Sequence, residues 1–200
     1  MRKQDKAVLI AMVLGDGYIS KPKTGQKSCG IRLVHSIKQK EYIEAKAAFI
    51  NSVCGGRQNE VREINNNGYP GVIYTKSHKY FRVLRKALYK NNKKIFPLHV
   101  LERITPQAFA ILWMDDGSLY PKRRKGKIHA WEGVLSLYED FETCDTFASV
   151  IYRKFGVRPL LSKHKGRYRL VFNTTKLRLL LPQIEEYSVP CMKYKFTMQR

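Results

Sequence analysis

The sequence is poor in acidic residues relative to basic ones. Its 200 residues include 38 lysines and arginines against 16 aspartates and glutamates, which gives a formal net charge of +22. Self-repulsion of this size indicates a polyanionic partner, with nucleic acid favoured and an anionic membrane surface as the alternative. Apolar residues still make up 44% of the chain, which is enough for a packed core and excludes general disorder.

Cysteine pairs and long apolar runs are also lacking. The four cysteines are scattered without a C-x-x-C pair, which argues against a zinc site or a disulfide framework and favours buried free thiols. The apolar run near the N-terminus stops at Asp16, has no small-residue cleavage site and falls short of the roughly 20 residues of a membrane span. We therefore expect an intracellular protein that is neither secreted nor embedded in a membrane.

The order of expected elements repeats along the chain. Helices expected over 5–16 and 105–116 are each followed by the pattern β-β-α-β-β-α, and their final aspartates, Asp16 and Asp116, are 100 residues apart. Lys94 and Lys195 follow those aspartates by 78 and 79 residues. No low-complexity linker separates the halves. We predict a duplicated chain with halves at 1–99 and 100–200, packed as one unit.

Both repeated helices end on an acid, which is unfavourable beside the partial negative charge of a helix C-terminus. The following Gly17 and Gly117 fit the left-handed residue that often terminates a helix. One such end is explained by a buried helix with an exposed carboxylate and a glycine cap. Two in register favour paired helices whose carboxylates, Asp16 and Asp116, emerge together and bind a cation such as Mg²⁺, which prefers oxygen ligands.

These segments resemble the LAGLIDADG family of homing endonucleases, in its single-chain form with two motifs. "LIAMVLGDG" (9–17) and "FAILWMDDG" (109–117) correspond to the nine-residue motif, and "NNKKIFP" and "SVPCMKYK" look like the segments that carry the family's lysine. Ile111 and Trp113 are larger than the motif's usual residues, and Leu14 replaces its first aspartate. Register selects Asp116 rather than Asp115 as the counterpart of Asp16.

The resemblance implies an α+β fold of two αββαββα halves. Each half contributes a four-stranded antiparallel sheet to a DNA-binding saddle, and the motif helices form the interface. It also implies a monomer with an internal pseudo-two-fold that makes a double-strand break in a long DNA target and leaves short 3′ overhangs. Asp16 and Asp116, with backbone oxygens of Gly15 and Asp115, would bind Mg²⁺, for which Mn²⁺ can substitute. Lys94 and Lys195 would support the water network or the developing charge.

Alternation in the expected strands predicts which side chains face DNA. Ile31 and Leu33 suit the core and leave Arg32 outward, and Arg167 and Arg169 alternate in the same way with core residues. The turn at 121–127 is expected to grip phosphates. The expected DNA-contacting residues are Arg32, Arg57, Lys122, Arg123, Arg124, Lys125, Lys127, Arg167 and Arg169. The histidines show no metal-ligand spacing, so we expect structural or phosphate-contacting roles for His35, His78, His99, His129 and His164.

Two other functions fit the same scaffold. An RNA maturase would help an intron RNA to fold and splice, and a non-catalytic regulator would bind DNA without cutting it. Maturases on this scaffold often lose the acidic pair, although one protein can combine splicing and cutting, and a regulator that does not cut has no need of the pair. Because this chain retains Asp16 and Asp116, the sequence favours an endonuclease over either alternative.

Overall fold

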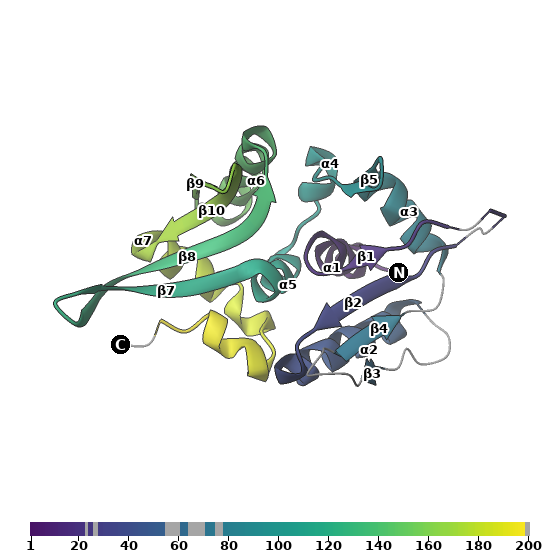
Figure 1. The fold of residues 1–200 in the computed structure, drawn as a ribbon, viewed down its shortest axis with the longest axis horizontal. Helices are drawn as coiled ribbons and strands as arrows, with labels where there is room; N and C mark the ends of the chain where they lie inside the picture. The colour runs from purple at the N-terminus through teal and green to yellow at the C-terminus, as the bar shows by residue number, and fades with distance from the viewer. Residues whose placement is uncertain (23, 26–27, 55–60, 64–70, 75–77, 199–200) are drawn as a thin grey trace. The chain divides into compact units, whose positions relative to one another are not determined.

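Two four-stranded antiparallel sheets carry the fold, one in each of the two units into which the chain divides (Figure 1). The computed structural model describes residues 1–22, 24–25, 28–54, 61–63, 71–74 and 78–198. The first unit comprises Met1–Pro97 with Val189–Cys191, and the second comprises Leu98–Ser188 with Met192–Arg200. The α+β class and the antiparallel sheets expected from the sequence are confirmed.

In the first unit, the helices and strands follow the expected order. They are α1 (Lys3–Leu14), β1 (Tyr18–Ile19), β2 (Ile31–His35), η1 (Ile37–Gln39), α2 (Lys40–Cys54), β3 (Val61–Glu63), β4 (Gly71–Tyr74), α3 (Lys79–Leu88), β5 (Tyr89–Lys90) and β6 (Lys93–Lys94). The sheet has the strand order β1-β2-β4-β3, and α2 packs against β2, β3 and β4. Strands β5 and β6 form a separate two-stranded hairpin.

The second unit repeats this order with longer strands. Its elements are α4 (Leu98–Leu101), α5 (Pro106–Asp116), β7 (Gly117–Arg124), β8 (Lys127–Glu139), α6 (Phe141–Phe155), β9 (Leu160–His164), β10 (Arg167–Asn173), α7 (Thr174–Leu180), η2 (Leu181–Gln183), η3 (Glu185–Tyr187) and η4 (Pro190–Lys195), whose first two residues group with the first unit. The sheet order is β7-β8-β10-β9, and α6 and α7 pack against this sheet.

Alternating burial fixes the two faces of each sheet. In β2, Ile31 and Leu33 are buried and Arg32 is exposed, as predicted. In β10, Leu170 and Phe172 are buried, whereas Arg167 is exposed. A one-residue slip would exchange these faces, so burial of the apolar set holds the register of the strands.

Local sequence also explains where several elements begin and end. Thr105 Oγ1 accepts a hydrogen bond from the Ala108 backbone N–H at 3.2 Å and Pro106 follows it, which starts α5 as predicted. Helix α7 ends at Leu180, close to Pro182, which cannot continue an α-helix, and 3-10 turns follow. Asn91 and Asn92 both have positive φ, which matches the two-residue turn of a tight hairpin between β5 and β6.

The free thiols expected from the scattered cysteines are confirmed, but only two of the four are fully buried. All four cysteines are free; Cys29 and Cys144 are buried, but Cys54 and Cys191 are only half-buried. None of the described helices is both long and apolar enough to cross a membrane.

Gly17 and Gly117 end their helices in a different way from the predicted one. Neither is among the described glycines with positive φ, and Gly117 has φ −81°. Both are instead packed against the turn that precedes them. An added Cβ would collide with the carbonyl oxygen of Met12 at Gly17 and of Trp113 at Gly117, and at Gly117 it would also lie 2.6 Å from Trp113 Cδ2. Glycine is required here by close approach and not by backbone conformation.

We expect Gly117→Ala to lower the free energy of unfolding by about 3 kcal/mol, because the methyl group meets a fixed backbone carbonyl. Gly126→Ala is the control: Gly126 has a positive φ but open space around its added Cβ, so we expect a loss of only about 1 kcal/mol. Urea denaturation measures both losses. Equal losses at the two positions would contradict the close-packing explanation.

Candidate active site

In the first unit, a lysine ammonium binds the carboxyl end of α1. Lys94 Nζ donates to the carbonyl oxygens of Leu14 at 3.2 Å and Gly15 at 2.6 Å. These carbonyls lie at the end of the helix, where the partial negative charge is greatest. The ammonium group therefore offsets that charge directly before Asp16, the first residue beyond the helix cap.

The second unit contains the same arrangement at the end of α5. Lys195 Nζ donates to the carbonyl oxygens of Met114 at 2.5 Å and Asp115 at 3.2 Å. The indole Nε1 of Trp113 donates to the Lys195 carbonyl at 2.7 Å and so fixes the backbone that carries this lysine. The carbonyls bound by Lys94 and Lys195 are 100 residues apart in sequence, as are Asp16 and Asp116.

The two aspartates occupy slightly different positions at their helix ends. Asp16 lies beyond α1, two residues after its last helical residue, and its side chain is 37% exposed. Asp116 is itself the last residue of α5 and is half-buried, like Asp115. Each helix thus presents a carboxylate that solvent reaches, next to backbone carbonyls held by a lysine.

These donors suit a hard divalent cation, because carboxylate and carbonyl oxygens are the ligands that Mg²⁺ prefers. The two backbone carbonyls expected to bind metal, those of Gly15 and Asp115, already accept hydrogen bonds from the lysines. A carbonyl oxygen has two lone pairs, so this bond leaves one acceptor position. Their role as metal ligands stays a prediction.

Sequence reasoning missed a buried polar chain that leads to Asp16. His35, at the end of β2, is buried, and its Nδ1 lies 3.3 Å from Gln39 Oε1 and 3.6 Å from Asp16 Oδ2. On the other side of the ring, Nε2 lies 2.9 Å from Lys46 Nζ. Lys46 is 1% exposed, and its ammonium lies 4.3 Å from the centre of the Tyr42 ring.

This geometry assigns the tautomer of His35. A lysine ammonium donates hydrogen bonds and accepts none, so Nε2 must accept from Lys46 and the ring proton must sit on Nδ1. That proton then faces Gln39 and the Asp16 carboxylate. Two signals in the sequence point to this chain: His35 occupies a core position in the alternation of β2, and Lys46 interrupts the apolar face of α2.

The described chain matches the family model of the LAGLIDADG DNA endonuclease family over residues 6–180. The chain belongs to this family. Among solved structures, the homing endonuclease I-WcaI bound to its DNA recognition sequence superposes with a TM-score of 0.82 at 22% identity, covering 100% of this chain and 88% of that one. At this identity the likeness establishes the fold.

Curated relatives of this LAGLIDADG chain fall into two groups by length. The RecA protein of Mycobacterium shimoidei is 27% identical over 199 residues, which cover 96% of this chain and 46% of that protein. The chain therefore spans about half the length of the curated relatives it matches first. The probable intron-encoded endonuclease 1 of Wickerhamomyces canadensis is 25% identical over 201 residues, covering 98% of this chain and 84% of that protein.

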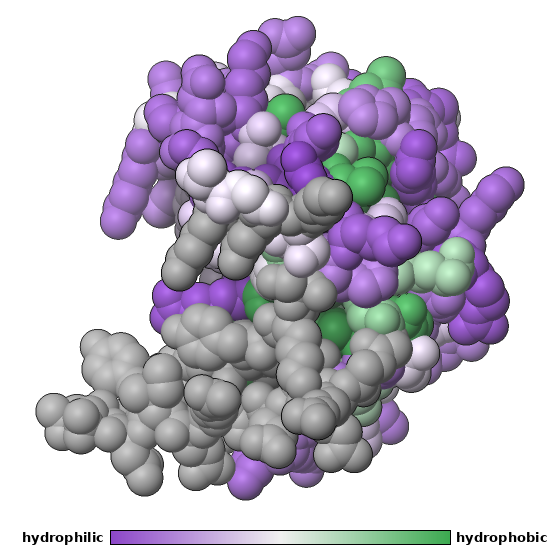
Figure 2. All heavy atoms as spheres, turned by 90° about the vertical axis from the view of Figure 1, so that its right-hand side faces the viewer, coloured by the Kyte–Doolittle hydropathy of each residue, from purple (hydrophilic) through white to green (hydrophobic). Residues whose placement is uncertain are grey.

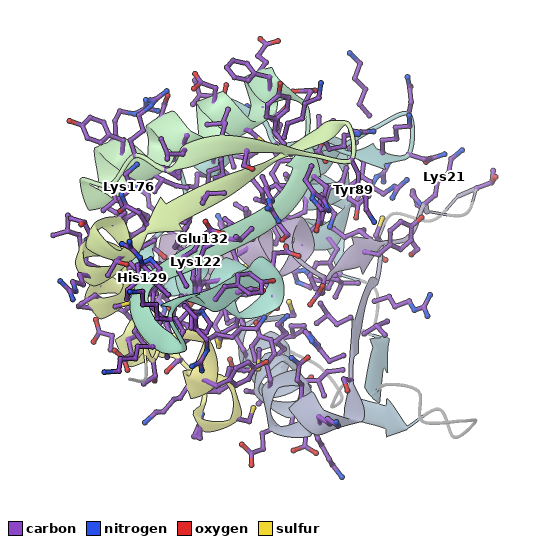
Figure 3. The ribbon with its side chains drawn as sticks, turned by 60° about the vertical axis from the view of Figure 1, so that its left-hand side comes forward. Lys21, Tyr89, Lys122, His129, Glu132 and Lys176 are labelled. Carbon is purple, nitrogen blue, oxygen red and sulfur yellow. The ribbon has the colours of Figure 1, made fainter. Side chains whose placement is uncertain are left out.

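The basic turn of this LAGLIDADG protein lies at the tip of a long hairpin. Strands β7 and β8 meet at Lys125 and Gly126, both of which have positive φ. Lys122 Nζ lies 3.0 Å from Glu132 Oε1 on the neighbouring strand, and Figure 3 shows the two side chains close together. The predicted DNA-contacting residues that are exposed on this hairpin are Lys122, Arg123, Arg124, Lys125 and Lys127.

The other predicted DNA contacts have mixed surroundings. Arg32 is exposed on β2, and Arg167 is exposed on β10 with its guanidinium 3.8 Å from Glu139. Arg169 is half-buried, and its Nε is a buried donor with no hydrogen-bond partner in the part of the chain that the structure describes. Arg57 lies outside the described residues. Hydrophilic side chains cover much of the described surface visible in Figure 2, as the net charge suggests.

If each lysine neutralises its helix end, we expect Lys94→Met and Lys195→Met each to lower the free energy of unfolding by roughly 1–2 kcal/mol. The neighbouring exposed lysines supply matched controls, Lys93→Met and Lys193→Met, which remove the same charge without touching a helix carbonyl. Urea denaturation of all four variants measures the difference. Losses as large in the controls would contradict this role.

Proposed function

We propose that this chain is a site-specific DNA endonuclease that hydrolyses both strands of a long duplex target with a divalent metal ion. One observation carries the proposal: an apolar helix that ends in Asp-Gly, with a lysine on its last carbonyls, occurs twice at a 100-residue interval. It occurs in a chain of the LAGLIDADG DNA endonuclease family. The acid is unfavourable as a helix ending, so its repetition indicates a chemical use.

The proposal requires the halves at 1–99 and 100–200 to act as one pseudo-two-fold monomer. Helices α1 and α5 would pack side by side, so that Asp16 and Asp116 share a site for Mg²⁺, or Mn²⁺ in its place. When bound, such an ion supplies an activated water and offsets charge on the phosphate. The residues Ala7 to Leu14 are all buried, which supports a central place for α1.

The chain's own residues have distinct tasks around this site. The lysines hold the helix-end carbonyls in place, and their positive charge would stabilise charge that develops on the phosphate. His35, held by Lys46 with its proton on Nδ1, would orient the Asp16 carboxylate. The 3.6 Å separation of Nδ1 and Oδ2 is slightly longer than a hydrogen bond, so the attraction between the two groups is electrostatic.

The two antiparallel sheets would form one saddle on the duplex. Arg32, Arg167 and Arg169 would meet base edges in the wide major groove, where arginine can bind guanine through two hydrogen bonds. The hairpin tip of β7 and β8 would hold phosphates. As the family resemblance implies, cleavage would leave short 3′ overhangs, and the protein would act inside the cell where its DNA lies.

The direct test is cleavage of a duplex that joins the sequences flanking the gene, or of a library of partly randomised duplexes. We expect Asp16→Asn together with Asp116→Asn to reduce cleavage by a factor of about 1,000 or more, because metal activation is lost. Binding of the same duplex should persist, since the change removes only negative charge. Glu44→Gln, an exposed acid on α2, is the control.

Retention of cleavage by the double variant, or cleavage that proceeds with chelator and no divalent ion, would refute the proposal. Binding of a structured intron RNA with no cutting of any duplex would instead favour a maturase.

The role of His35 has its own test. In ¹⁵N NMR spectra of the metal-free protein, we expect His35 to carry its proton on Nδ1 and Lys46→Met to redistribute it between the two nitrogens. Both Lys46→Met and His35→Ala should slow cleavage roughly 10- to 100-fold, the usual cost of removing a residue that orients a metal ligand. Unchanged duplex binding serves as the control. An Nε2-protonated ring in the unmodified protein would contradict the assignment.

A further inference from the structure

A basic cavity of about 520 Å³ lies in the first unit, between α3 and the β5–β6 hairpin. Helix α3 contributes Arg82, Arg85 and Lys86, and Lys21 comes from the segment after β1. Figure 3 labels Lys21 and Tyr89, two of the residues that line it. None of the described lining residues is acidic. We refer to this cavity as the Arg85 pocket.

Arg85 carries a buried charge whose partners among the described residues are neutral groups. It is 8% exposed, and its guanidinium donates to the Ile19 carbonyl and to Asn92 Oδ1, the latter at 2.7 Å. The same group lies 4.5 Å from the centre of the Tyr89 ring. Among the side chains that the structure describes, no carboxylate pairs with it.

An arginine in this position favours an anionic ligand. Buried charges in proteins are normally paired, and a guanidinium cannot relieve the cost by losing its proton. Burial raises the pKa of the Cys29 thiol in the pocket wall, while the charges of Arg85 and Arg82 oppose that rise. With Arg82, Lys86 and Lys21 around the opening, the local field is positive and attracts a phosphate group.

The hairpin links this pocket to the candidate active site of the same unit. Asn92 precedes Lys94 by two residues, which corresponds to roughly 7 Å of strand, and Lys94 binds the end of α1 beside Asp16. Since a duplex rises about 3.4 Å per nucleotide along each strand, a phosphate in the pocket would lie within a few nucleotides of that site.

We propose that the Arg85 pocket binds one backbone phosphate of the duplex, a few nucleotides from the cleavage point. This inference rests on the proposed function, because it takes DNA as the ligand. Arg82 and Lys86 contact the phosphate at the pocket opening, and Arg85 supplies the positive charge behind them. The pocket reads no base, so it adds affinity and fixes position without adding sequence preference.

The experiment measures duplex affinity against salt concentration for the full chain and three single variants. Arg82→Ala and Lys86→Ala should each weaken binding roughly 3- to 10-fold and reduce the salt slope by about 0.9, the value for one phosphate contact. Lys79→Ala removes one charge from α3 outside the pocket and should leave the duplex affinity and the salt slope unchanged. Because Arg85 also supports the fold, it is not varied.

A duplex series with one neutral methylphosphonate linkage at successive positions then locates the contact. At one position near the cleavage point, the neutral linkage should weaken binding by the unmodified protein and have no effect on Arg82→Ala. If the Arg82 and Lys86 variants bind with the affinity and salt slope of the unmodified protein, the pocket proposal is overturned and the proposed endonuclease function is not. Failure of the unmodified protein to bind or cut any duplex would overturn both.

The last measurement is the binding of inorganic phosphate to the protein without DNA, by calorimetry. If phosphate alone binds in an Arg82-dependent manner and the DNA measurements show no difference, the pocket serves a small phosphate ligand and the DNA assignment is overturned. If free phosphate does not bind but the pocket variants bind the duplex more weakly, the result supports a contact made by a phosphate of the duplex itself.

Discussion

The structure of each unit depends on a lysine ammonium at the carboxyl end of an apolar helix. A helix end, two carbonyls and an aspartate concentrate negative charge within one turn, and a cation there makes the concentration tolerable. In each unit, other elements of the fold position the lysine that carries this charge. The β5–β6 hairpin carries Lys94 to α1, while the Trp113 indole holds the backbone of Lys195 beside α5. The same contact between a lysine and a helix end is thus made by two different local structures.

Close packing after the acid couples the helix end to the sheet. Because Gly17 and Gly117 lie against the preceding turn, the chain passes from helix to strand within three residues in the first unit and directly in the second. Strand β7 begins at Gly117 itself, and β1 begins at Tyr18. The carboxylate is therefore fixed by both the helix and the first strand of the sheet. A strand that moved on binding a duplex would move the acid with it, so the proposed DNA-binding surface and the proposed metal ligand share one rigid connection.

The repeated pattern made much of this predictable, since helix and strand periodicity, the capping Thr105 and the spacing of the two lysines are all local signals. Geometry that depends on distant residues was not. The glycines looked like left-handed caps because sequence cannot report the approach of the Trp113 ring. Lys46 was not among the predicted site residues, although it interrupts the apolar face of α2. The pairing of Lys46 with His35 arises only when α2 packs on β2.

Buried cations in the first unit show that the excess charge serves more than solubility. Lys46 and Arg85 are both buried; Lys46 lies against the His35 imidazole and the Tyr42 ring, and Arg85 donates to a carbonyl and an amide oxygen beside the Tyr89 ring. The described partners of Arg85 accept hydrogen bonds without cancelling its charge, so the positive potential persists around it. A carboxylate at the same place would pair with the cation and cancel much of that potential. Neutral acceptors therefore suit the proposed polyanionic partner, because the field remains available to the ligand.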